Sequence, residues 1–359
     1  MRMRGCLITL GDPGRVTGGY LYHRHMAAAA GRYDASLEFV SFPRGPFLLS
    51  AGAGPRVLAR IRALDPDVVV LDSIAAAFAA LWLPRVNLPV AAIVHQSPGG
   101  VGHSWPRSRI QAGLDVAAYR RADITMVASA SLVPELKARG ISGRRIRVVP
   151  PGRDVTKTPL GRLPELRAGR KVALLCVANW TPRKGLIDLL DTVVRLPPDL
   201  ATLHFVGDDR VNACYARALR RRLLDVNLRD RVVVHGLIPS LEVARMYAAA
   251  DIFVLPSMQE AYGTVFAEAM AAGLPVVGWH SGNLPHLADD GVEGLVVPTG
   301  DIEGLTHALK TISEDDGLRS RMASNARDRA RKFPTWEQTS EAFFGALRAL
   351  VATKNAGRD

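Results

Sequence analysis

Residues 256–275 constrain this chain more than any other stretch, because they predict a strand, a loop and a short helix in fixed order. An apolar run of strand length, residues 251–255, precedes them. Helix-forming residues follow Gly263, whose lack of a side chain lets a ligand approach the backbone. Gly273 and Pro275 then stand where a helix C-cap and a stop signal belong.

Two carboxylates stand in this stretch, Glu260 on the loop and Glu268 inside the helix. A helix N-terminus offers free N–H groups and the positive end of a dipole, which suit a phosphate. A carboxylate is a good acceptor for the hydroxyls of a sugar. The pattern therefore favours a ligand with phosphate in its middle and hydroxyls at both ends, such as a nucleotide-sugar. Taken singly, either glutamate fits a solvated surface charge better.

The full string makes the interpretation specific. From Glu260 to Glu268 two glutamates enclose seven residues, and Ala-Met-Ala-Ala-Gly-Leu-Pro-Val follows. This resembles the signature of the retaining glycosyltransferases of family 4, which have the GT-B fold, two Rossmann-like α/β domains facing across a cleft. The resemblance implies a hexosyltransferase that moves a sugar from a nucleoside diphosphate sugar to an acceptor with retained configuration. It also implies that no metal or other cofactor is required.

Length and patterning agree with two α/β domains. A chain of 359 residues is too long for one common domain. Apolar runs alternate with helical stretches, which predicts parallel sheets covered on both faces. We expect a first domain at 1–155, a linker at 155–170, a donor domain at 156–335 and a closing helix at 336–359 that returns to the first domain. The expected strands are 6–10, 37–41, 68–71, 90–94, 124–127, 146–149, 172–177, 203–206, 232–235, 252–255, 275–278 and 294–297.

Composition bounds the location and the partners. Apolar content of 48% with 22% charged residues is typical of a soluble globular protein. Three scattered cysteines, a charged start and only a short apolar run after it favour a cytoplasmic protein without a signal peptide. Residues 1–160 carry +11 of the net charge of +12. This excess indicates either an anionic or membrane-bound acceptor, with peripheral contact at the inner face of the membrane, or an arginine-rich composition without function. No basic segment interleaved with aromatic residues supports nucleic-acid binding.

The first half offers two candidate ligand contacts. A glycine-rich turn follows the first strand, and Gly18 and Gly19 match the paired glycines that approach the donor diphosphate in the family. The turn lacks the spacing of a dinucleotide-binding loop. His95 ends a predicted strand, where open α/β sheets place ligands, and it matches the histidine that the family holds near the donor sugar.

The second half offers the diphosphate contacts. Arg183 and Lys184 stand beside a predicted helix N-terminus and together suit an anion. In the family the lysine is usual, but the arginine stands earlier, where this chain has Asn179, so Arg183 is the expected replacement. Asn283 and His286 also replace the usual glycine and glutamate of a later loop.

The resemblance implies the following roles. Catalytic residues are Glu260, Lys184, Arg183 and His95, and residues that bind the donor are Gly18, Gly19, Tyr262, Gly263, Thr264, Glu268 and Leu237. A UDP-sugar is the first expectation for the donor and GDP-mannose the second, with a sugar, lipid or small molecule as acceptor. Two alternatives remain at this point: a nucleotide-sugar-binding protein without transferase activity, and a GT-B nucleotide-sugar epimerase.

Overall fold

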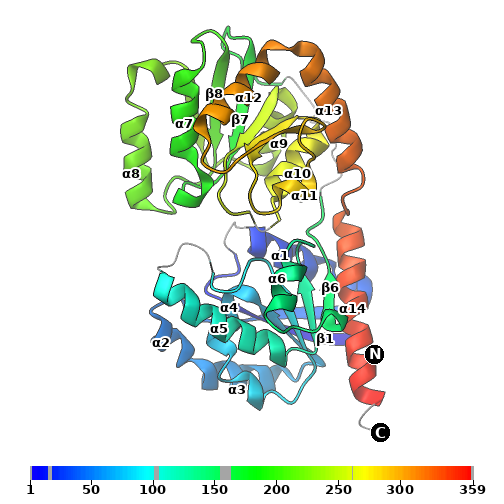
Figure 1. Ribbon diagram of the computed structural model, residues 1–359. Helices are drawn as coiled ribbons and strands as arrows, with labels where there is room; N and C mark the ends of the chain where they lie inside the picture. The colour runs from blue at the N-terminus through cyan, green and yellow to red at the C-terminus, as the bar shows by residue number, and fades with distance from the viewer. Residues whose placement is uncertain (1, 15–17, 101–104, 154–162, 261, 357–359) are drawn as a thin grey trace. The chain divides into compact units, whose positions relative to one another are not determined.

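The chain folds into two compact units (Figure 1). Unit 1 comprises Met1–Gly152 and Pro334–Asp359, and unit 2 comprises Arg153–Phe333. The computed structural model describes residues 2–14, 18–100, 105–153, 163–260 and 262–356. Much of the expected linker, residues 154–162, therefore lies outside the described residues.

Unit 1 is built on a parallel six-stranded sheet in the order β2-β1-β3-β4-β5-β6. Its elements in chain order are β1 (Met3–Leu10), α1 (Gly18–Ala29), η1 (Ala30–Tyr33), β2 (Ala35–Phe42), α2 (Phe47–Ala51), α3 (Gly54–Leu64), β3 (Val68–Asp72), α4 (Ser73–Ala79), η2 (Leu83–Arg85), β4 (Val90–Val94), α5 (Trp105–Arg121), β5 (Ile124–Val127), α6 (Leu132–Ala138), η3 (Gly143–Arg145), β6 (Ile146–Val148) and α14 (Trp336–Ala356).

Unit 2 repeats this plan with the order β12-β11-β10-β7-β8-β9, again entirely parallel. Its elements are β7 (Val172–Val177), η4 (Pro182–Lys184), α7 (Leu186–Arg195), β8 (Ala201–Val206), α8 (Ala213–Arg222), η5 (Val226–Leu228), β9 (Val232–Gly236), α9 (Ser240–Ala249), β10 (Ile252–Leu255), α10 (Thr264–Ala272), β11 (Val276–Trp279), α11 (Leu284–Leu287), β12 (Gly294–Val297), α12 (Ile302–Glu314) and α13 (Asp316–Ala330).

The strand sequences explain the sheets. Successive side chains of a strand point to opposite faces, and in β1 Cys6 and Ile8 enter one core of unit 1 while Leu7 enters the other. Because helices cover both faces, β3 and β4 are buried along their whole length. The predicted α/β fold with two parallel sheets is confirmed, and most expected strands lie within three residues of the observed bounds.

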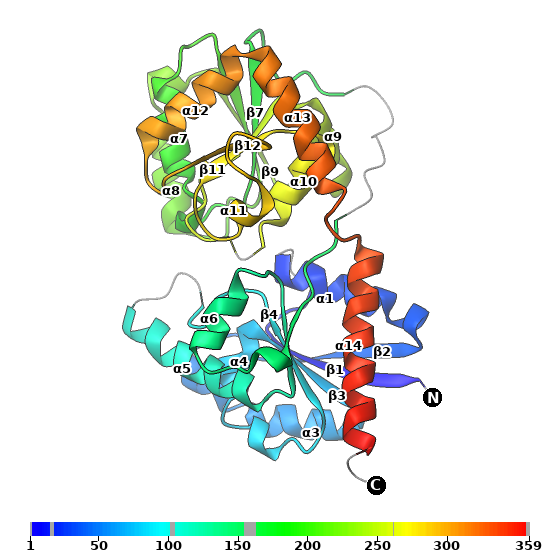
Figure 2. The ribbon, with the colours of Figure 1, turned by 45° about the vertical axis from the view of Figure 1, so that its right-hand side comes forward.

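The last helix, α14, completes the core of unit 1. Figure 2 shows it beside the strands of this unit. Phe343, Phe344 and Leu347 are buried in the same cluster as Leu7 and Met26. Within the described ranges, no helix is both long and apolar enough to cross a membrane.

We expect Phe343→Ala to destabilise unit 1 by about 3–5 kcal/mol, because it removes a large side chain from a packed core and leaves a cavity. Hydrogen-exchange mass spectrometry measures this as faster exchange in β1. The control is Glu341→Ala, which changes an exposed residue of the same helix. Unchanged exchange in β1 with Phe343→Ala would contradict this account of the core.

Candidate functional site

The candidate site of unit 2 lies where its strand order reverses. The chain leaves β7 for β8 and β9 on one side and then returns to place β10 on the other side of β7. Ligands of open α/β sheets bind at the carboxyl ends of the strands at such a switch point. The loop after β7 carries Arg183 and Lys184, and the loop after β10 carries Glu260. The fold therefore brings together charges that are far apart in the sequence.

A buried ion pair joins these two loops. Lys184 Nζ donates a hydrogen bond to Glu260 Oε1, and only about a tenth of either side chain is exposed. Arg183 Nη1 lies 3.6 Å from the same carboxylate oxygen and donates to the Gln259 carbonyl at 2.9 Å. Burial lowers the pKa of Lys184, Glu260 opposes this effect, and the neighbouring Arg183 adds to it.

The two loops also interlock through their backbones. The Met258 N–H donates to the Arg183 carbonyl at 2.8 Å, and the Ser257 hydroxyl donates to the same oxygen at 3.1 Å. Gly185 adopts a φ of +63°, and a Cβ there would lie 2.1 Å from the Pro256 carbonyl oxygen. Only glycine permits this approach, so Lys184 and Glu260 meet because residue 185 lacks a side chain.

Asn283 supports the Glu260 loop from a third strand end. Its N–H donates to the Glu260 carbonyl at 3.0 Å, and its buried side-chain Nδ2 donates to the Tyr262 carbonyl at 2.8 Å. A glycine, usual at this place in the family, could not make the second bond. The departure seen in the sequence thus has a local structural role that sequence reasoning missed. His286, the other departure, is exposed.

The glutamate-bearing helix α10 is preceded by Gly263, its N-cap residue, whose φ of +83° is unfavourable for other residues. No side chain in the described part of the chain caps this N-terminus. Thr264 opens the helix, and Glu268 accepts a hydrogen bond from the Tyr247 hydroxyl at 3.1 Å. Burial first, and the Glu268 charge second, raise the pKa of Tyr247 well above its ordinary value, so this tyrosine stays a neutral donor.

The N-terminus of α7 differs from the sequence prediction. We expected free N–H groups beside Lys184, but the Ile187 N–H donates to the Tyr215 hydroxyl at 3.3 Å. Tyr215 comes from α8 and is invisible to a local pattern. Asn179, which replaces the usual arginine, accepts a hydrogen bond from the Asp208 N–H at 3.0 Å and thereby links the ends of β7 and β8.

Leu237, expected near the nucleotide base, follows β9 and is 56% exposed. The preceding His235 lies 2.9 Å from His204, Nε2 to Nδ1, and His204 Nε2 contacts the Leu166 carbonyl at 2.7 Å. Burial lowers the pKa of both histidines, which favours the neutral rings. Tyr262 is also buried, and burial raises its pKa to about 12.

Unit 1 brings a second group together, at the carboxyl ends of β1, β3 and β4. A Cβ on Gly19 would lie 3.5 Å from His95 Cδ2, so the first turn of α1 lies beside the histidine. Gly18 begins α1. Behind His95 lie His23 of α1 and Asp72 of β3, both buried, with His23 Nε2 3.0 Å from Asp72 Oδ2.

Burial gives this group unusual protonation. Burial would raise the pKa of Asp72, but His23, His95 and a hydrogen bond from Thr9 outweigh it and lower the pKa to about 2. The pKa of His95 falls to about 3, chiefly through burial and then through His23, although Asp72 opposes the shift. His95 is therefore neutral near pH 7, while Asp72 is charged.

Within the described residues, His23, Asp72 and His95 are also the one group of histidine and acidic side chains close enough to hold a metal ion, with ligand atoms within 4.8 Å of one another. Two histidines and a carboxylate form a donor set that suits zinc or iron. Sequence reasoning named His95 and missed its two neighbours, because they come from separate elements.

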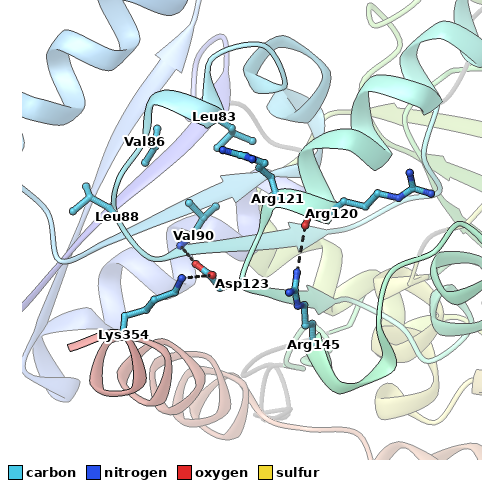
Figure 3. Close-up of a pocket in the computed structure, with 9 residues that line it drawn as sticks. All are labelled: Leu83, Val86, Leu88, Val90, Arg120, Arg121, Asp123, Arg145 and Lys354. Carbon is cyan, nitrogen blue, oxygen red and sulfur yellow. Dashed lines mark hydrogen bonds and ion pairs between the residues drawn. The ribbon is translucent and has the colours of Figure 1, made fainter. Parts of the chain in front are cut away.

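A pocket of about 260 Å³ lies at the opposite end of the unit 1 sheet (Figure 3). It is lined by Leu83, Val86, Leu88, Val90, Arg120, Arg121, Asp123, Arg145 and Lys354. Lys354 pairs with Asp123 at 2.7 Å, and Arg145 donates to the Arg120 carbonyl at 3.3 Å. This pocket lies at the amino-terminal ends of β4 and β5, away from the strand ends that carry the candidate residues, so we assign it no part in the chemistry.

Comparison with protein families assigns both halves of the chain. Residues 164–329 match the family described as "Glycosyl transferases group 1". Residues 8–157 match "Glycosyltransferase Family 4". The two matches together cover most of the chain. The protein therefore belongs to the family 4 glycosyltransferases of GT-B fold.

Solved structures support the fold. Sucrose-phosphate synthase from Thermosynechococcus elongatus matches with a TM-score of 0.85 and 21% identity, over 98% of this chain and 100% of that one. HepE from Anabaena, in complex with UDP-glucose, matches with a TM-score of 0.79 and 20% identity, over 96% of this chain and 99% of that one.

The similar proteins that have an assigned activity do not share one activity. The chain is 27% identical over 308 residues to the sulfoquinovosyl transferase SQD2 of Arabidopsis thaliana, covering 79% of this chain and 57% of the relative. It is 32% identical over 211 residues to a D-inositol 3-phosphate glycosyltransferase of Xylanimonas cellulosilytica, covering 55% and 50%. The chain thus spans about half the length of these two. A GDP-mannose-dependent alpha-(1-6)-phosphatidylinositol monomannoside mannosyltransferase of Mycobacterium tuberculosis is 27% identical over 84% of this chain and 82% of its own.

We expect Glu260→Gln to destabilise unit 2 by about 3–5 kcal/mol, because it leaves the buried Lys184 cation without its counter-charge. Hydrogen exchange in β7 and β10 measures the change. A double variant, Glu260→Gln with Lys184→Met, should recover most of the loss, since no unpaired charge remains. Equal instability of the single and double variants would show that the pair is not the cause.

We expect acid to destabilise unit 1 through His95. Its pKa is about 3 in the folded protein but near 6.5 when the chain is unfolded, so only the unfolded chain binds a proton between these values. The contribution of the neutral ring is therefore complete above about pH 6.5 and is lost as pH falls, by up to about 1.4 kcal/mol per pH unit. Urea denaturation between about pH 7.5 and pH 5 should show a smaller pH dependence for His95→Gln than for wild type. Equal dependence would contradict a neutral His95.

Proposed function

We propose that this protein transfers a sugar from a nucleoside diphosphate sugar to an acceptor hydroxyl. The observation that carries the proposal is the buried Lys184–Glu260 pair at the switch point of unit 2, with Arg183 beside it. Two cations and the uncapped N-terminus of α10 suit a diphosphate leaving group. Membership in a glycosyltransferase family favours transfer over binding alone and over epimerisation.

We assign roles to the donor-site residues as follows. Lys184 and Arg183 stabilise the charge of the diphosphate as it leaves. Glu260 accepts hydrogen bonds from sugar hydroxyls, while Glu268 holds the ribose. The backbone at Tyr262, Gly263 and Thr264 contacts the phosphate and the sugar, and Leu237 lies by the base. In unit 1, Gly18 and Gly19 are assigned to the diphosphate and His95 to the donor sugar.

The proposed reaction retains the anomeric configuration and requires no metal. The bond from the anomeric carbon to the diphosphate oxygen breaks, and a bond from the same face of that carbon to the acceptor oxygen forms. The acceptor proton goes to the leaving diphosphate oxygen. In this scheme the protein supplies fixed charges and hydrogen-bond donors, and no side chain acts as the base.

A UDP-sugar is the first proposal for the donor, and GDP-mannose the second. Similar proteins support both as candidates: HepE was solved with UDP and with UDP-glucose, and the mycobacterial mannosyltransferase is GDP-mannose-dependent. The excess positive charge of the first half supports an anionic or membrane-bound acceptor at the inner face of the membrane. The three free cysteines support a cytoplasmic location.

The test is thermal stabilisation and slow donor hydrolysis with UDP-, GDP-, ADP- and TDP-sugars. We expect one donor class to stabilise the wild type selectively and Glu268→Ala to lose this effect, because the ribose contact is gone. Glu303→Ala, which removes an exposed helix glutamate of the same unit, is the control. Stabilisation by no donor would overturn the site. Binding with no transfer to any sugar, lipid or small-molecule acceptor would overturn the activity.

A further inference from the structure

The buried group behind His95 carries more interactions than a packing role requires. Asp72 ends β3, and its side chain also accepts a hydrogen bond from the Ile74 N–H at 3.3 Å, which caps α4. The Thr9 hydroxyl of β1 donates to Asp72 Oδ2 at 2.7 Å. With His23 Nε2 at 3.0 Å, groups from several elements hold one fully buried carboxylate. An ionised group deep in a core is costly unless it is held in this way.

The same elements surround the His95 ring. Its centroid lies 5.0 Å from that of Tyr22 and 5.0 Å from that of His23, both in edge-to-face geometry. The backbone N–H of His95 donates to the Ser73 hydroxyl at 3.3 Å. Ser73 follows Asp72 directly in the chain. Gly19, in the first turn of α1, lies beside the ring, since a Cβ built on it would lie 3.5 Å from His95 Cδ2. The ring is therefore held between α1 and the end of β3.

We propose that His23 and Asp72 are positioning residues that hold the His95 ring in one orientation and one tautomer at the carboxyl ends of the unit 1 strands. The role of His95 in the reaction rests on the proposed function. The arrangement of His23 and Asp72 around His95 does not depend on it. The two residues are buried and touch no solvent-facing atom of the site, so they act through His95. A catalytic group that is already oriented loses less freedom on reaching the transition state.

The charge arrangement supports this role. The anionic Asp72 lies 3.0 Å from His23 Nε2 and favours one orientation of that ring, whose centroid lies 5.0 Å from that of His95. Within the described residues, the buried ring nitrogens His95 Nε2, His23 Nδ1 and His23 Nε2 have no hydrogen bond of good geometry, although His23 Nε2 lies 3.0 Å from Asp72 Oδ2. The orientation of His95 therefore depends on packing and on the field of Asp72 rather than on a hydrogen bond of its Nε2 within the described residues.

A graded series of variants tests the proposal. Thr9→Val removes one donor to Asp72 at constant shape, Asp72→Asn removes the charge, and His23→Leu removes the partner ring. Thr125→Val is the matched control, because Thr125 is a buried strand residue of the same sheet whose hydroxyl has no partner among the described residues. His23→Gln restores a donor at the position of Nε2 and serves as the conservative rescue.

We expect kcat to fall by about threefold in Thr9→Val and by about tenfold or more in Asp72→Asn and His23→Leu, with the donor KM unchanged. His23→Gln should stay within about threefold of wild type, and Thr125→Val should have no effect. Rises in KM without loss of kcat, or an equal loss in His23→Gln and His23→Leu at unchanged melting temperature, would overturn the proposal.

Histidine NMR separates this inference from the proposed function. In ¹⁵N-labelled protein without donor, the ring signals of His95 should report a single tautomer in wild type and a mixture in Asp72→Asn. This result stands even if no donor is turned over, which would defeat only the proposed function. An unchanged His95 tautomer in Asp72→Asn would overturn the inference, as would one equivalent of bound zinc per chain in metal analysis of the wild-type protein.

Discussion

The ion pair between Lys184 and Glu260 depends on the whole of unit 2. Its two residues come from loops that follow β7 and β10, and these strands are neighbours only because the chain reverses its strand order there. A buried cation is stable only with a counter-charge at close range. The loops must therefore keep their contact, which the side-chain-free Gly185 permits and the clamp by Asn283 maintains.

In unit 1, the buried carboxylate of Asp72 has a role like that of the ion pair in unit 2. Asp72 receives hydrogen bonds or charge from β1, α1 and the start of α4, and it thereby joins three elements at the strand ends. Both units thus use a charged group in a covered position at the carboxyl end of a parallel sheet. In each, the fold meets the cost of burial with several polar contacts, and the same contacts orient residues that are candidates for chemistry.

Short sequence patterns predicted many of the helices and strands and some of the site residues. The central strands β3, β4 and β10 are largely continuous apolar runs, and α10 lies between Gly263 and Gly273, both with positive φ. The two glutamates of this stretch could be named because their spacing forms part of a long motif. Tyr215, Asn283, His23 and Asp72 could not be named with a role, since each acts on a residue that is distant in the sequence and the motif does not include them.

The sequence by itself determined the alternation of strands and helices and the glycines at positions of positive φ. These follow from periodicity and backbone sterics, which act over a few residues. Only the tertiary structure decided which polar groups meet: Lys184 with Glu260, and Asp72 with His23. Such pairs depend on strand order and on burial, and burial changes the pKa of a group according to neighbours that the chain brings from far away.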